Sequence, residues 1–178
     1  LSVLAPLRDL AAERADNLSA DLTWARAPFE ITATAFYSRV QDPLQVRETG
    51  RLADPLELAN ADGPTRTRGT EVIAPYHRDE PELDVILTHM YLWSTEVDPF
   101  APDRRREVPL NPRHAGSLDV LGEIGPVRIG FEVFATGRQS LEENPYRTVG
   151  AAYVLFGALI DWNVGGARLF LNAENLGD

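Results

Sequence analysis

Apolar and polar residues alternate along much of the chain, and this two-residue period is the pattern of a half-exposed β-strand. The clearest run covers residues 17–24, where Leu18, Leu22 and Trp24 alternate with polar neighbours such as Ser19 and Asp21. A second alternating run, 29–38, follows after the short break 25–28. Because the break is short, we expect these two strands to pair as an antiparallel hairpin.

The same pattern predicts further strands near residues 65–76, 83–93, 113–121, 127–133, 148–160 and 167–175. The connections alternate in length, being short after every odd-numbered strand and long after every even-numbered one. Short turns at one end and long loops at the other are typical of outer-membrane barrels, whereas a soluble sandwich has no reason to sort its loops in this way. The fold class that follows is all-β, an antiparallel meander of about eight strands in a transmembrane β-barrel.

The alternation also predicts which side chains share a face of the sheet. Apolar Leu18, Leu22, Val127, Ile129, Phe131 and Val133 should lie opposite the polar set Ser19, Asp21, Arg128 and Glu132, because a slip of one residue would reverse every side chain. Aromatic residues lie near many strand ends, as expected for rings at a membrane–water interface. They are Trp24, Phe29, Tyr37, Tyr76, Tyr91, Trp93, Tyr153, Trp162 and Phe170.

Composition narrows the classes of protein that remain. The 178 residues carry 17 basic and 27 acidic side chains, for a formal net charge of −10, and every basic residue is an arginine. Hydrophobic residues make up 44% of the chain, which argues against disorder, and the acidic charge argues against a nucleic-acid partner. The absence of cysteine excludes disulfides and thiolate chemistry. The apolar stretch 149–160 is too short for a membrane helix, but a barrel strand needs only about 10 residues.

No catalytic or metal-binding constellation is predicted. His77, His89 and His114 have no metal-ligand spacing to one another. The acidic neighbours Glu142 and Glu143, like Asp9 and Glu13, fall in predicted loops, and Ser117 and Ser140 lack the sequence around a hydrolase nucleophile. We therefore expect neither an enzyme nor a cofactor.

Several motifs, taken in chain order, resemble those of TonB-dependent outer-membrane receptors. Residues 10–17 resemble the entry to a late barrel strand, although Ala11 and Ala12 stand where the family usually has Lys-Pro. The others are Ala-Thr-Ala-Phe-Tyr at 33–37, Thr-Arg-Gly-Thr-Glu-Val at 67–72, Asn-Pro-Arg-His at 111–114, Phe-Ala-Thr-Gly-Arg at 134–138 and Asn-Ala-Glu-Asn-Leu-Gly-Asp at 172–178. The ordered set covers nearly the whole chain.

The resemblance implies that the strands are part of a large transmembrane β-barrel and that residues 1–178 are a C-terminal segment of it, with 1–16 as a loop leading into the first strand. The final strand, the plug domain and the segment that engages TonB would then lie outside this sequence. The implied function is TonB-energised uptake, across the outer membrane of a Gram-negative bacterium, of a bulky scarce ligand such as a ferric siderophore or cobalamin. The implied partners are outer-membrane lipid and lipopolysaccharide, the plug domain, TonB and a small-molecule metal chelate.

Two groups of charged residues are candidate contacts in this setting. Glu71, Arg128, Glu132 and Arg168 interrupt apolar neighbours on predicted strands, so they would point into the barrel lumen. Arg104, Arg105 and Arg106 form the main cluster of positive charge. They would either contact an anionic chelate or lipopolysaccharide phosphates, or form a solvated loop tip beside acidic neighbours.

Two alternative folds are also compatible with the sequence. One is a complete small barrel of about eight strands with a structural or adhesive role, and the other is a soluble β-sandwich that binds a ligand. A regular ladder between 17–24 and 167–175 would favour the small closed barrel, and an open sheet would favour a segment of a larger wall. We expect the open sheet.

Overall fold

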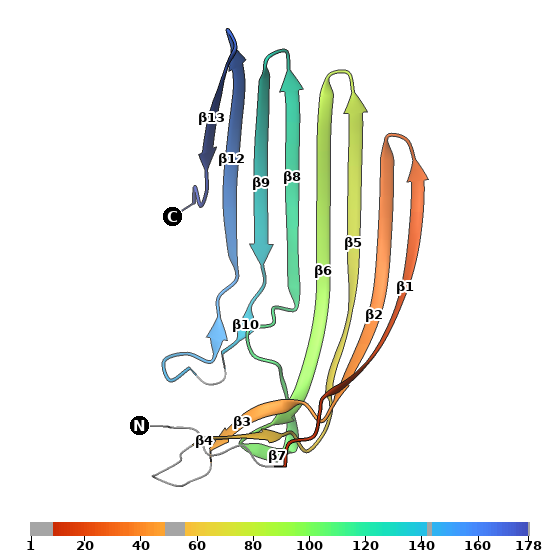
Figure 1. The fold of residues 1–178 in the computed structure, drawn as a ribbon, viewed down its shortest axis with the longest axis vertical. Helices are drawn as coiled ribbons and strands as arrows, with labels where there is room; N and C mark the ends of the chain where they lie inside the picture. Colours follow the sequence, from red (N-terminus) through yellow and green to blue (C-terminus); the bar gives the residue numbers. More distant parts are fainter. Residues whose placement is uncertain (1–8, 49–55, 142–143, 178) are drawn as a thin grey trace.

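The computed structural model describes residues 9–48, 56–141 and 144–177. Their regular secondary structure consists of β-strands (Figure 1). None of the described residues forms a helix long and apolar enough to cross a membrane. The strands are β1 (Arg14–Arg26), β2 (Phe29–Gln41), β3 (Leu44–Glu48), β4 (Leu56–Asn60), β5 (Thr65–Asp79), β6 (Glu82–Asp98), β7 (Ala101–Glu107), β8 (His114–Ile124), β9 (Val127–Thr136), β10 (Gln139–Ser140), β11 (Val149–Gly150), β12 (Tyr153–Val164) and β13 (Ala167–Ala173).

One curved sheet carries the long strands in the order β1-β2-β5-β6-β8-β9-β12-β13, and β7 pairs with the end of β6. Every neighbouring pair is antiparallel. Strands β1 and β13 lie at opposite edges, and the described residues contain no ladder between them (Figure 1). The expected all-β meander is therefore confirmed, and the open sheet disfavours a small closed barrel.

The two ends of the sheet differ in their connections. At the turn end, two-residue turns join β1 to β2, β5 to β6, β8 to β9 and β12 to β13. The last of these turns is Gly165 and Gly166, both with positive φ (54° and 85°), the conformation that a tight type I′ hairpin requires. At the loop end, long connections carry the hairpin β3–β4, strand β7 and the short pair β10–β11 (Figure 1).

Several strand bounds differ from the predicted ones. Strand β1 begins at Arg14, so the loop expected over 1–16 ends earlier, and residues 1–8 lie outside the described part. Strand β12 begins at Tyr153 instead of 148, because Val149 and Gly150 pair with β10 in a separate two-stranded sheet. Strand β6 continues to Asp98, where β7 pairs with it. Periodicity does not reveal such partners, since strand formation depends on what a segment can pair with.

The register divides the long sheet into two faces without a slip along any of the eight strands. Phe131 packs against Phe156 with ring centroids 6.4 Å apart, whereas the carboxylate of Glu132 lies over Gly157. Since side chains alternate along a strand, these contacts lie on opposite sides. The predicted facing is confirmed, and we call the sides the apolar face (that of Phe131) and the polar face (that of Glu132).

The described residues enclose almost no core. Only Ala61 and Val97 are buried hydrophobic residues, and no large side chain is fully buried. On the apolar face Leu18 and Leu22 are 72% and 74% exposed. A continuous apolar surface of this kind is not stable in water and requires an apolar surrounding, which lipid provides.

Aromatic residues border the apolar face at both ends. Trp24, Phe29, Tyr76 and Trp162 lie toward the turn end, with the rings of Phe29 and Tyr76 5.0 Å apart. Tyr37, Tyr91 and Trp93 lie toward the loop end. The expectation was wrong for Tyr153 and Phe170, which stand opposite Thr136 and Asp161 on the polar face. Their place near a strand end suggested a girdle, but the parity of the register decides the side.

Candidate functional site

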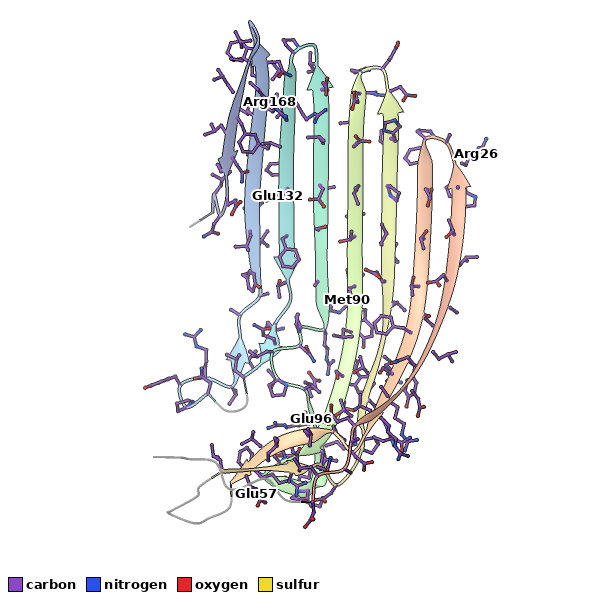
Figure 2. All side chains as sticks on the ribbon, in the orientation of Figure 1. Arg26, Glu57, Met90, Glu96, Glu132 and Arg168 are labelled. Carbon is purple, nitrogen blue, oxygen red and sulfur yellow. The ribbon has the colours of Figure 1, made fainter. Side chains whose placement is uncertain are left out.

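Ion pairs join neighbouring strands on the polar face at the turn end. Arg128 donates from Nη2 and Nε to Oε2 of Glu123, at 2.8 and 3.1 Å. Arg168 donates from Nε to both carboxylate oxygens of Asp161, each at 2.8 Å. Asp161 is only 4% exposed, so its charge depends on this bidentate partner. Figure 2 shows Arg168 at this end of the sheet, far from Glu96 and Glu57.

These pairs use two of the predicted polar candidates, but with partners that the sequence analysis did not single out. Arg128 and Arg168 were expected only to point into the barrel lumen. Their partners are Glu123 and Asp161. A signal for the first existed, because Glu123 and Arg128 are equally distant from the two-residue turn and must stand opposite each other in a hairpin.

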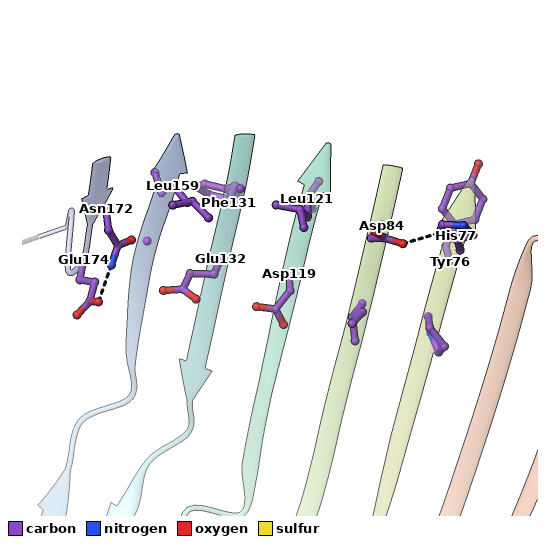
Figure 3. Close-up of a pocket in the computed structure, with 16 residues that line it drawn as sticks. Tyr76, His77, Asp84, Asp119, Leu121, Phe131, Glu132, Leu159, Asn172 and Glu174 are labelled. Atoms are coloured by element: carbon purple, nitrogen blue, oxygen red, sulfur yellow. Dashed lines mark hydrogen bonds and ion pairs between the residues drawn. The ribbon is translucent and has the colours of Figure 1, made fainter. Parts of the chain in front are cut away.

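An acidic hollow of about 570 Å³ lies on the polar face, closer to the turn end (Figure 3). Its carboxylates come from four strands or their ends and are Asp84, Asp119, Glu132 and Glu174, with Leu121 and Leu159 between them. Asp84 contacts His77 Nδ1 at 2.5 Å, and Glu174 accepts a hydrogen bond of 2.8 Å from Asn172. The hollow therefore offers negative charge above an apolar floor.

The remaining polar candidate, Glu71, stands apart from this hollow. It lies on β5 on the polar face, in register with Thr34 on β2 and Met90 on β6. Hydroxyl groups surround this middle part of the face, as in the contacts of Thr34 with Asp21 at 2.6 Å and of Thr88 with Ser117 at 3.0 Å. The structure thus brings Glu132 into the acidic hollow and leaves Glu71 on a hydroxyl-rich surface.

The predicted arginine cluster does not act as one patch. In the ladder with β6, Arg105 stands opposite Val97 and Arg106 opposite Glu96, so these two arginines point to opposite sides of β7. Arg105 donates from Nη2 to the carbonyl oxygens of Pro64 (2.9 Å) and Thr95 (2.8 Å). Partial burial lowers the pKa of Arg105 from its ordinary value, and the nearby charge of Arg66 lowers it further.

The other two arginines of the cluster have different surroundings. Arg106 donates from Nε to Oε1 of Glu96 at 2.7 Å, and its side chain is only 9% exposed. Arg104 is 78% exposed, with Asp103 at 3.9 Å. Of the three, Arg104 therefore has the geometry of the solvated loop tip, while Arg105 and Arg106 hold the loop end together.

A second hollow, of about 640 Å³, lies among the loops at the loop end. Three connections contribute to it: the β3–β4 hairpin, the β6–β7 turn and the segment that precedes β11. Its apolar lining includes Leu44, Val46, Leu56, Pro99 and Phe100, and its charged lining includes Arg47, Glu96 and Arg106. Phe100 is 56% exposed, so its ring is available to a ligand. The sequence analysis missed this hollow, since it depends on loops that meet only in the fold.

The histidines do not form a metal centre. His89 Nε2 lies 3.3 Å from His114 Nδ1 on the apolar face, and His77 is distant at the turn end. In the part of the chain that the structure describes, no three His, Asp or Glu side chains are arranged to hold a metal ion. Glu142 and Glu143, one of the loop carboxylate pairs, lie outside the described residues.

Solved structures with the same fold are described as transporters or import receptors. The FrpB iron transporter from Neisseria meningitidis (F3-3 variant) superposes with a TM-score of 0.73 at 15% identity, over 98% of this chain and 28% of that one. The copper transporter OprC superposes with a TM-score of 0.71 at 18% identity, over 96% of this chain and 26% of that one. The ferric-catecholate import receptor Fiu from E. coli K12 superposes with a TM-score of 0.68 at 17% identity, over 92% of this chain and 23% of that one. The chain thus spans about a quarter of the length of these structures.

Comparison with protein families identifies the chain at the sequence level. No match was found among curated protein sequences. Residues 2–176, nearly the whole chain, match the family model described as TonB dependent receptor-like, beta-barrel. The match agrees with the open antiparallel sheet, the apolar face and the sorted loop lengths. The chain therefore belongs to the TonB-dependent receptors of the Gram-negative outer membrane, a family of transporters and not of enzymes, and forms part of the barrel wall.

Proposed function

We propose that this wall segment serves the TonB-energised uptake of a bulky metal chelate, which is captured at the loop end and passes through the barrel. The observation that carries the proposal is the loop hollow of about 640 Å³, on a chain of this family. Binding sites for small molecules have volumes of roughly 300–1,000 Å³ and are mostly apolar with a few polar groups. The loop hollow has this size and this mixture.

The position of the loop hollow supports capture from outside the cell. Long loops of outer-membrane barrels lie on the extracellular side and short turns on the periplasmic side. Phe100 and Leu56 offer apolar contact, and Arg106 offers a guanidinium whose charge is partly compensated by Glu96. An aromatic or catechol-like chelate with moderate negative charge fits such a lining.

The polar face supports the second part of the proposal. In a barrel, the face opposite the apolar one lines the lumen, so Glu71, Arg128, Glu132 and Arg168 would face the plug domain. Glu132 belongs to the acidic hollow, which would receive basic or hydrogen-bond-donating groups of the plug. The ion pairs of Arg128 and Arg168 instead stiffen the wall where the plug meets the periplasmic end.

Structures of the same fold support this class of ligand. The three similar structures are described as an iron transporter, a copper transporter and a ferric-catecholate import receptor. The last of these names refers to a metal held in an organic chelate. Such a chelate suits an apolar hollow better than a bare ion would, because a bare ion prefers charged oxygen ligands. A ferric siderophore is therefore the first ligand to test, with cobalamin second.

The test is direct binding to the full-length chain in detergent, measured by calorimetry with ferric catecholate, ferric hydroxamate and cobalamin in turn. We expect one of these to bind, and Phe100→Ala or Leu56→Ala to weaken it by about tenfold or more, since each removes a large apolar contact. Leu110→Ala is the matched control, because Leu110 is 64% exposed at the loop end and does not line the hollow.

Uptake in cells gives the second readout. Ligand accumulation should require TonB and should fall in the Phe100→Ala variant while the amount of receptor in the outer membrane stays constant. Failure of all three chelates to bind would refute the proposed ligand class. Equal binding by the Phe100→Ala, Leu56→Ala and unmodified chains would refute the loop hollow as the capture site.

A further inference from the structure

The β3–β4 hairpin is not held in place by strand pairing with the long sheet. Its two strands form a separate sheet, and the described part of the chain contains no ladder between that sheet and the long one. Figure 1 shows the hairpin lying across the loop end of the long strands. Asp42, with φ of 53°, is in the left-handed region and turns the chain from β2 into the hairpin. The orientation of the hairpin must therefore be set by contacts other than a ladder.

Asn60, the last residue of β4, joins the hairpin to the segment before β1. Its Oδ1 accepts a hydrogen bond of 2.8 Å from the backbone N–H of Ala11, and its Nδ2 donates to the carbonyl oxygen of Ala11 at 3.0 Å. Nδ2 also donates to the carbonyl oxygen of Asp42 at 2.6 Å. The amide thus uses its acceptor and both of its donor hydrogens. A carboxylate, which only accepts, could not make the last two of these bonds.

A second contact holds the other strand of the hairpin to the same segment. Oε1 of Glu13 accepts a hydrogen bond of 2.7 Å from the N–H of Leu44, the first residue of β3. The N–H of Ala61 donates to the carbonyl oxygen of Pro43 at 2.7 Å and closes the base of the hairpin. A tilt of the hairpin would therefore break several hydrogen bonds at once. We call the residues that make the contact from both sides the latch, and they are Ala11, Glu13 and Asn60.

The latch residues do not line the loop hollow, but two of them hold residues that do. Arg47, part of the lining, donates from Nη2 to the carbonyl oxygen of Asn60 at 3.0 Å. Arg47 also forms an ion pair with Asp62 at 3.3 Å, and its side chain is only 20% exposed. Leu44, whose N–H is held by Glu13, is also part of the lining. A change in the latch would therefore move the wall that the hairpin contributes to the hollow.

We propose that Asn60 and Glu13 are positioning residues for ligand capture, because they fix the hairpin wall of the loop hollow relative to the opposite wall at Phe100. This inference rests on the proposed capture at the loop hollow. A site that is formed before the ligand arrives loses less entropy on binding. A hairpin that also occupies other orientations lowers the apparent affinity in proportion to the time it spends out of place. The segment before β1 thus contributes to binding without contact with the ligand.

The first test measures the orientation of the hairpin in the absence of any ligand. Spin labels are placed at Glu57→Cys on β4 and Arg26→Cys at the turn end, which lie at opposite ends of the molecule (Figure 2). The 178 residues contain no cysteine of their own. Double electron–electron resonance on the full-length chain in detergent should give one narrow distance distribution. Asn60→Asp should broaden or shift it, because the new carboxylate would face the carbonyl oxygens of Ala11 and Asp42.

Two matched variants serve as controls in the same measurement. Asn17→Asp makes the same substitution on β1, at an exposed residue whose side chain forms no hydrogen bond within the described residues, and should leave the distribution unchanged. Glu13→Gln keeps an oxygen that can accept the N–H of Leu44 and should also leave it unchanged, whereas Glu13→Ala should broaden it. The thermal midpoint should be nearly the same in every variant, because the latch lies outside the long sheet.

The second test measures affinity by calorimetry, with whichever of ferric catecholate, ferric hydroxamate and cobalamin binds the unmodified chain. Asn60→Asp and Glu13→Ala should weaken binding by about fivefold or more, since the hairpin wall is then in place for a smaller part of the time. Glu13→Gln and Asn17→Asp should bind as the unmodified chain does. If Asn60→Asp fails to fold, Glu13→Ala carries the same prediction.

The two tests separate this inference from the proposed function. An unchanged distance distribution in Asn60→Asp would overturn the latch. A changed distribution with unchanged affinity would overturn the positioning role, while a loss of affinity in Phe100→Ala would still support capture at the loop hollow. If none of the three chelates binds, the proposed ligand class fails, and the spin-label distances alone decide whether the latch holds the hairpin.

Discussion

Two glycines on the polar face are equally crowded but have different neighbours. A Cβ atom at Gly69 on β5 would lie 2.3 Å from the carbonyl oxygen of Tyr91 and 2.6 Å from Cζ of Phe36. A Cβ atom at Gly157 on β12 would also meet an atom at 2.3 Å, but this is Oε1 of Glu132. The carbonyl oxygen is fixed by the ladder, whereas the carboxylate ends a flexible side chain. We therefore expect Gly69→Ala to destabilise the barrel and Gly157→Ala to leave it nearly unchanged.

The size of the effect at Gly69 follows from three contributions. Overpacking against a fixed neighbour costs about 1–3 kcal/mol, and a weakened ladder hydrogen bond costs about 0.5–1.5 kcal/mol. Replacing glycine restricts the unfolded chain and returns about 0.4–1 kcal/mol. The free energy of unfolding should thus fall by about 1–3.5 kcal/mol. At Gly157 a changed rotamer of Glu132 costs about 0.5–1.5 kcal/mol, which the same entropy gain largely offsets.

The measurement is the free energy of unfolding in urea, for the full-length chain in detergent, followed by tryptophan fluorescence. Adding Phe36→Ala to Gly69→Ala removes the ring from the crowded space but not the oxygen of Tyr91. It should therefore fail to restore the stability of the unmodified chain. Equal losses for Gly69→Ala and Gly157→Ala, or a larger loss at Gly157, would refute the reasoning.

Two further predictions concern the faces and the ion pairs. Phe131→Arg should make folding into a bilayer less favourable by about 2–4 kcal/mol, because it places a charge on the lipid face. Glu132→Arg should have a much smaller effect. Similar losses in a folding titration would show that the faces are assigned wrongly. Arg168→Gln should lower the thermal midpoint, because Asp161, at 4% exposure, loses its bidentate partner. Adding Asp161→Asn should recover part of that loss, and a double variant no more stable than the single one would contradict the pairing.

Much of the fold could be predicted from the sequence, because the information is local. The alternation around Leu18 and Phe131 specifies both the strands and their facing, since the side-chain period of a strand is two. Short turns such as that between β8 and β9 specify antiparallel neighbours and even place Glu123 opposite Arg128. Ordered motifs such as Thr-Arg-Gly-Thr-Glu-Val at 67–72 led to the family that the comparison then identified.

The candidate sites were less predictable, because they depend on residues that the chain brings together from a distance. The run Arg104, Arg105 and Arg106 suggested either one anionic contact or a solvated loop tip, but the register of β7 with β6 sends Arg105 and Arg106 to opposite sides. The loop hollow needs three long connections to meet, and no periodic pattern indicates where such loops fold.

The sequence by itself therefore determined the eight long strands, their order, their facing and the family, since each follows from the neighbours along the chain or from motifs within it. Only the tertiary structure decided which charges meet. The ion pair of Arg168 with Asp161 joins β13 to β12, and the acidic hollow is assembled from residues as distant as Asp84 and Glu174. The physical reason is that charge and shape act between side chains that are close in space, and register across several strands, not position in the sequence, sets those distances.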